Sequence, residues 1–181
     1  GFASFGLEPL ASLGAGQAYG IELFAQKKLS NSPWYGIAAL SVNRSIFTAI
    51  DGVERPSNFD QTLLFSLSGG WKISDLWEVG MKFRLATGRP YTPVGPGGDP
   101  SFGYRIVEQT NELRLGTSHQ LDLRVDRRWP LGIGELITYI DVQNVYNRQN
   151  PSAPRFNVRT QEGEINEGIG ILPTIGVSLE W

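Results

Sequence analysis

The chain has 181 residues, a formal net charge of -2, one histidine and no cysteine. Without cysteine it can form neither disulfides nor thiolate metal sites, and its near-neutral charge gives no bulk attraction to nucleic acid. No continuous apolar run approaches the roughly 20 residues that a membrane-spanning helix needs. We therefore expect no metal site, no cofactor and no nucleic-acid partner.

Segments that alternate apolar and polar residues recur along the chain, each near the roughly 9–11 residues of a membrane-crossing strand. Successive side chains of a strand point to opposite faces, so each segment has an apolar face and a polar face. In the clearest segment, Trp77 and Val79 alternate with Glu78 and Lys82. The seven segments cover residues 18–29, 34–45, 60–73, 77–88, 119–129, 135–147 and 172–181.

The connections between these segments alternate in length. The short ones are at 30–33, 74–76 and 130–134. The long ones, rich in Pro, Gly, Asn and Asp, are at roughly 46–59, 89–118 and 148–171. Short turns at one end and long loops at the other are typical of outer-membrane barrels. The pattern predicts an all-β fold, an antiparallel transmembrane β-barrel.

Tryptophan gathers at the short-turn ends of these segments, always on the apolar parity. The five residues are Trp34, Trp71, Trp77, Trp129 and Trp181. Tryptophan favours the membrane–water interface, so we expect an outward-facing girdle there. The alternative is a soluble lipocalin-like binder, which would bury these rings in a core.

The polar parity carries many charges. The predicted lumen-facing residues, which would contact a plug or a solute, are Glu78, Lys82, Arg84, Asp122, Arg124, Asp126 and Asp141. In a dry core so many charges would be costly, whereas in a wet lumen they are ordinary. A simpler hypothesis is a ladder of cross-strand ion pairs that fixes the strand register.

The strand count bears on completeness. If Trp181 lies at the periplasmic side, residues 1–16 lie outside the cell as an extracellular loop or partial strand, and residues 17–181 form the barrel. A complete bacterial barrel has an even number of strands, so seven strands favour the last part of a larger barrel. The alternative is a self-contained eight-stranded barrel, acting as an anchor or adhesin, with its eighth strand from residues 1–16.

Three stretches occur in the order "TGRPYTP", "LDLRVDRRW" and "DVQNVYNRQN", and "GVSLEW" ends the chain. This series, within residues 17–181, resembles the C-terminal barrel of TonB-dependent outer-membrane receptors. The resemblance implies a barrel of about 22 strands in the Gram-negative outer membrane. It implies uptake of a siderophore, cobalamin or glycan, and as partners outer-membrane lipid, a plug domain, the remaining strands and TonB.

A hydrolase is the last alternative. Ser118 and His119 are adjacent, and adjacent side chains of a strand point to opposite faces, so they make a poor catalytic dyad. We expect no enzymatic activity and no catalytic residue.

Overall fold

The computed structural model describes residues 14–181. The predicted extracellular loop or partial strand at 1–16 therefore lies almost entirely outside the described residues. Its last two positions belong to the first strand, which begins at Ala15.

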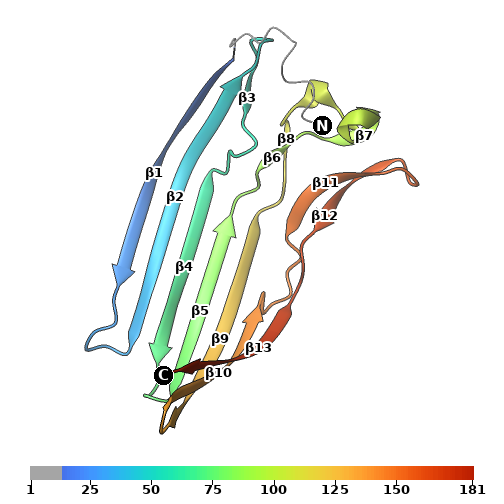
Figure 1. The fold of residues 1–181 in the computed structure, drawn as a ribbon. Helices are drawn as coiled ribbons and strands as arrows, with labels where there is room; N and C mark the ends of the chain where they lie inside the picture. The colour runs from blue at the N-terminus through green and yellow to red at the C-terminus, as the bar shows by residue number, and fades with distance from the viewer. Residues whose placement is uncertain (1–13) are drawn as a thin grey trace.

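Seven long antiparallel strands form the main sheet, in chain order across it (Figure 1). They are β1 (Ala15–Lys27), β2 (Trp34–Thr48), β4 (Leu63–Lys72), β5 (Trp77–Ala86), β9 (Ser118–Leu131), β10 (Gly134–Gln143) and β13 (Leu172–Glu180). Each corresponds to one of the seven alternating segments, so the predicted all-β antiparallel organisation is confirmed. The boundaries differ mostly at the long-loop ends, where β1 and β2 extend further than predicted and β4, β5 and β10 are shorter. At the short-turn end β1 ends earlier and β9 ends later than predicted.

The long connections contain structure that the sequence did not predict. Short strands form within them: β3 (Glu54–Pro56), β6 (Pro90–Tyr91), β7 (Val94–Asp99), β8 (Leu113–Arg114), β11 (Pro151–Asn157) and β12 (Glu162–Glu167). β3 pairs with β2, β6 with β8, and β11 with β12 in a separate hairpin. Prolines within β11 made this region resemble a loop, and its register shifts between Pro151 and Pro154, as expected of a strand interrupted by proline.

The strand register sorts the side chains onto two faces. Ile21 lies opposite Val42, and Val42 lies opposite Leu63 on its other side. The apolar face consists of the odd-numbered residues of β1, β4, β5, β9 and β13 and the even-numbered residues of β2 and β10. The remaining residues of these strands form the polar face.

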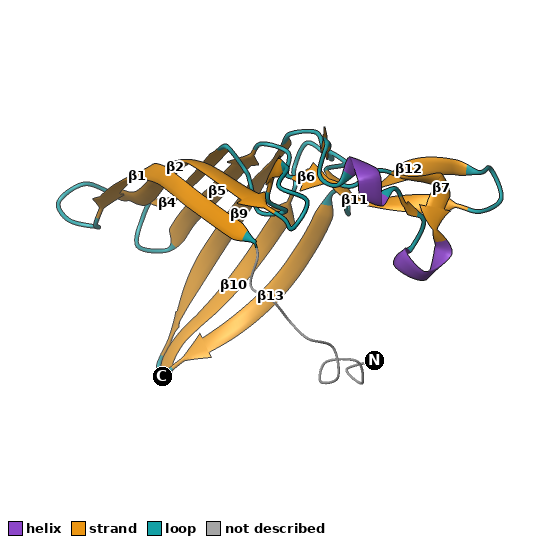
Figure 2. Cartoon of the chain, turned by 90° about the horizontal axis from the view of Figure 1, so that it is seen from above, coloured by secondary structure: helices purple, strands orange, loops and turns teal. Residues whose placement is uncertain are grey.

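The main sheet is curved but open. Seen from above, β10 and β13 lie at an angle to β1 and β2 (Figure 2). β1 and β13 are the two edges of the sheet, and within residues 14–181 neither has a second neighbour. The predicted closure into a barrel is therefore not seen, and the count of about 22 strands finds no support.

The sheet buries very little apolar surface. Among the described hydrophobic residues, only Leu115 and Ile137 are buried. On the apolar face Ile175 is 79% exposed and Val177 71% exposed. A soluble monomer rarely exposes so large a continuous apolar surface, so this face requires a partner. No helix in the part of the chain that the structure describes is long and apolar enough to cross a membrane.

Candidate functional site

All five tryptophans lie on the apolar face or directly continue it, near the short-turn end of the sheet. Trp34 is the first residue of β2 and lies opposite Trp71 of β4. Trp77 begins β5, and Trp181 follows the last strand. Their exposed fractions run from 39% for Trp129 to 94% for Trp181. This exposure does not fit the buried rings of a soluble binder, while contact with lipid stays a prediction.

Two cations lie among these tryptophans. The Lys27 ammonium is 4.5 Å from the centre of the Trp34 ring. The Arg127 guanidinium is 3.7 Å from the centre of the Trp129 ring and 5.0 Å from that of Trp77. Sequence reasoning missed Arg127 as a site residue, although its odd number places it on the parity of Trp129.

All seven predicted lumen-facing residues lie on the polar face. Across the strands, Glu78 lies opposite Asp126, and Lys82 lies opposite Asp122. Arg84 lies opposite Gln120. Asp141 and Arg124 are register partners on β10 and β9. The structure therefore brings these residues onto one surface across three strands, and contact with a plug or solute stays a prediction.

The ion pairs on this surface form only part of the predicted ladder. Arg128 bridges the strands, at 3.4 Å from Glu78 and 3.4 Å from Glu135. Arg124 pairs instead along its own strand with Asp126, at 2.6 Å. Lys82 and Arg84 form no ion pair within residues 14–181. Both residues lie on the polar face, so that face carries two positive charges without a counter-ion among the described residues.

Two tyrosines cover glycines on the polar face. The Tyr35 hydroxyl donates to Glu78, and its ring lies where a Cβ on Gly70 would stand. Tyr139 covers Gly176 in the same way, and the Arg124 guanidinium stacks on the Tyr139 ring at 3.8 Å. Sequence reasoning did not predict these contacts, because the pairing of a tyrosine with a glycine across strands depends on the register.

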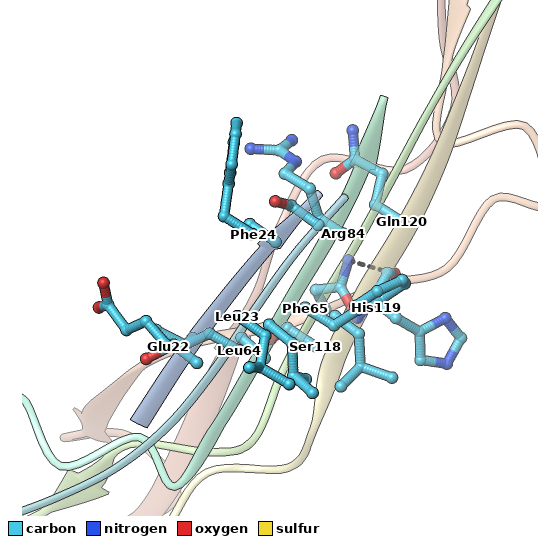
Figure 3. A pocket seen from close by; sticks show the side chains of 16 residues that line it. Glu22, Leu23, Phe24, Leu64, Phe65, Arg84, Ser118, His119 and Gln120 are labelled. Carbon is cyan, nitrogen blue, oxygen red and sulfur yellow. Dashed lines mark hydrogen bonds between the residues drawn. The ribbon is translucent and has the colours of Figure 1, made fainter. Parts of the chain in front are cut away.

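The polar face is the hollowed side of the sheet. A cavity of about 560 Å³ is lined by Arg84, Gln120 and Phe24, among others (Figure 3). Two further cavities, of about 440 Å³ and 470 Å³, lie along the same face beside Lys82 and Arg128. The charges thus line a concave surface, as water-facing residues of a barrel would.

At the long-loop end, Asp60 joins three segments of the chain. Its side chain is fully buried and accepts from the Ser45 backbone N–H at 2.6 Å, from Arg44 at 3.2 Å and from Arg114. Burial alone would raise the pKa of Asp60, but these donors outweigh it and hold the pKa below its ordinary value. The cluster ties the loop that carries Asp60 to β2 and β8.

The hydrolase alternative gains no support from the geometry. Ser118 lies on the polar face and His119 on the apolar face. The His119 ring Nδ1 is instead 2.7 Å from the Tyr146 hydroxyl. No group of three potential metal ligands comes together among the residues that the structure describes. The lack of enzymatic activity stays a prediction.

Comparison with known proteins finds a partial match. No family model matches the chain, and no solved structure matches it significantly. A stretch of 91 residues is 35% identical to the LPS-assembly protein LptD of Thiobacillus denitrificans, covering 46% of this chain and 11% of that protein. The chain thus spans about a tenth of the length of this relative. The match and the antiparallel all-β sheet together support an outer-membrane β-barrel protein.

The match contradicts the predicted resemblance to TonB-dependent receptors, which is wrong. The quoted motifs are short, and their alternation with aromatic ends follows from the physics of any strand between lipid and water. They therefore indicate the outer membrane without distinguishing one barrel family from another. Uptake of a siderophore, cobalamin or glycan, the plug domain and TonB lose their basis with the resemblance.

Proposed function

We propose that this chain forms part of the wall of an outer-membrane β-barrel in a Gram-negative cell. Its apolar face meets lipid, and its polar face lines an aqueous interior. The observation that carries the proposal is the distribution of charge over the two faces. Every acidic residue of the seven long strands lies on the polar face: Glu22, Glu78, Asp122, Asp126, Glu135, Asp141 and Glu180.

The open edges of the sheet set a condition on this environment. In the hydrocarbon of a membrane, unpaired backbone groups are costly, so a sheet must close on itself or on other strands. The free edges of β1 and β13 therefore require further strands in the membrane, or each other. A self-contained eight-stranded barrel would need its additional strand from the residues before Ala15, of which 1–13 lie outside the described part.

The proposed cargo is supported by the relative and by the polar face. LptD is named as an LPS-assembly protein, and we extend lipopolysaccharide as cargo to the assembly that contains this chain. Lipopolysaccharide carries phosphates and acyl chains. The cavity of about 560 Å³ combines the Arg84 guanidinium with the apolar side chains of Phe24 and Leu64, a lining suited to an anionic and amphipathic molecule.

The placement of the two faces can be tested with single cysteines, since the chain has none of its own. Ile140→Cys and Asp141→Cys are neighbours on β10 but lie on opposite faces. In vesicles, a charged, water-soluble maleimide should label Asp141→Cys quickly and Ile140→Cys slowly. Equal labelling of both, or recovery of the protein in the aqueous fraction, would contradict the proposal.

The cargo is tested separately with Arg84→Glu. Loss of a charge-assisted contact should lower retention of fluorescent lipopolysaccharide by about tenfold. The matched control is Arg159→Glu, which makes the same charge change in the exposed turn between β11 and β12. Equal retention by both variants would rule out the cargo at this cavity while leaving the membrane placement intact.

A further inference from the structure

Basic residues are the only ionisable charges on the apolar face. No Asp or Glu of the seven long strands lies there, whereas Lys27, Arg44 and Arg127 do. Arg44 is paired with buried Asp60 at the long-loop end. Lys27 and Arg127 remain at the short-turn end, among the tryptophans.

The Arg127 guanidinium lies against two indole rings, and its Nε has no hydrogen-bond acceptor among the described residues. Its guanidinium lies 3.7 Å from the Trp129 ring centre and 5.0 Å from the Trp77 ring centre. The Trp129 indole N–H is committed to the Thr138 hydroxyl at 3.0 Å, which fixes the orientation of that ring. Within residues 14–181 Arg127 has no ion-pair partner, and its Nε is buried without an acceptor.

This arrangement leaves a defined chemical requirement. Aromatic faces stabilise a guanidinium but offer it no oxygen acceptors, and a planar fork of N–H donors suits phosphate. Interfacial tryptophan rings lie at the level of the lipid headgroups, so Arg127 would lie at that level too. A phosphate there would neutralise a cation that has no counter-ion among residues 14–181.

We propose that Arg127, with Trp77 and Trp129, forms a site for the phosphate of an anionic phospholipid headgroup at the short-turn edge of the sheet. The rings pack against the upper acyl and glycerol region, and the guanidinium donates to the phosphate oxygens. This inference rests on the proposal that the apolar face meets lipid. It adds a preference for headgroup charge, which an apolar face alone would not show.

The test uses the full chain in nanodiscs that contain phosphatidylcholine and phosphatidylglycerol. The bulk lipids of the nanodisc are released in the mass spectrometer. Native mass spectrometry then counts the phosphatidylglycerol molecules that stay bound to the protein. Arg127→Gln should lower this retention by about fivefold, in line with the contribution of one basic residue at an anionic surface. Arg127→Lys, which keeps the charge but loses the planar fork, should fall between the two. The matched control, Arg159→Gln, makes the same change of charge in the exposed turn between β11 and β12 and should behave as the wild type.

Each outcome decides a different point. Equal retention by wild type and Arg127→Gln, or equal loss in Arg159→Gln, would overturn the headgroup site. Displacement of phosphatidylglycerol by inorganic phosphate at similar concentrations would show a site for free anions and overturn the lipid assignment. Quenching of tryptophan fluorescence by brominated phosphatidylcholine is independent of headgroup charge and tests the membrane placement itself. Without quenching in the wild type, the placement fails and the headgroup site with it; with quenching, only the headgroup site is in question.

Discussion

Asp60 shows how one residue can organise the long-loop end of the sheet. It is fully buried and contacts Arg114, which lies on β8, far along the chain from Asp60. Two guanidinium groups and a backbone N–H surround a single carboxylate, so its ionised form is strongly preferred. Removing the carboxylate would leave two arginines without their shared partner.

We predict that Asp60→Asn lowers the free energy of unfolding by about 1–3 kcal/mol at neutral pH. Because the folded-state pKa is lowered, the stabilisation is present in full well above the ordinary value of 3.8. It is lost as the pH falls below that value and through the lowered pKa. Denaturant unfolding in detergent from pH 7 to pH 2 should show this loss in the wild type and not in Asp60→Asn. Asp75→Asn, in an exposed turn, serves as the control and should change little.

Gly88 allows a close approach between two backbone segments. A Cβ at this position would fall on the backbone carbonyl oxygen of Leu115, one of the few buried apolar residues. We predict that Gly88→Ala lowers the free energy of unfolding by about 1–3 kcal/mol, since the backbone must shift to make room. At Gly97 an added Cβ meets nothing within 4 Å, so Gly97→Ala is the matched control. Equal stability of the two variants would show that the segments move apart without cost.

At the scale of the strand, the polar face uses its charges unevenly. Arg128 links β9 to β5 and β10 through Glu78 and Glu135. Lys82 and Asp122 also lie opposite each other on β5 and β9, but they form no ion pair in the described part of the chain. The Asp122 carboxylate is instead occupied by the Gln120 amide and the Asn144 backbone N–H.

This difference predicts different coupling across the same pair of strands. A double-mutant cycle with Glu78→Gln and Arg128→Gln should give a coupling energy of about 0.5–1 kcal/mol, as expected for a partly exposed ion pair. The same cycle with Lys82→Gln and Asp122→Asn should give a value near zero. Unfolding free energies of the wild type, the two single variants and the double variant in each cycle supply the measurement. Comparable coupling energies in both cycles would mean that lying opposite each other in the register is enough for coupling, without an ion-pair contact.

At the scale of the molecule, the unpaired edges of the sheet are the feature that favours association with other strands. β1 has 13 residues and β13 has nine, and neither has an outer neighbour among residues 14–181. Exposed strand edges are templates for pairing with other strands. The alternation of faces would continue across such a pairing and extend both the apolar and the polar surface.

We therefore predict that the isolated chain associates through these edges. In detergent, light scattering coupled to size-exclusion chromatography should give a protein mass that is a multiple of that of one chain. High detergent concentration should not dissociate the complex if backbone hydrogen bonds hold it together. A single chain per micelle would contradict this expectation and favour closure of β1 onto β13.

The alternation of residue types determined most of the sheet by itself. The odd residues of β5, from Trp77 to Leu85, lie together on the apolar face because side chains alternate strictly along a strand. The same local rule placed all five tryptophans and all seven predicted charges on their faces. Arg127 obeyed it too, and attention to its parity would have found it. Short motifs carried less, because any membrane strand shares their pattern, and the family inferred from them was wrong.

The tertiary structure alone decided what depends on pairing between distant segments. The Asp60 cluster joins side chains from β2, β8 and the loop between β3 and β4. The tyrosine–glycine contacts depend on a register that a slip of one residue would destroy. The short strands β11 and β12 form because they pair with each other, although the prolines of β11 disfavour a strand. The face on which a side chain lies follows from the two-residue period of a strand, and this period can be recognised within one short segment of sequence. Contacts across the chain arise only when the backbone hydrogen bonds of neighbouring strands select one register.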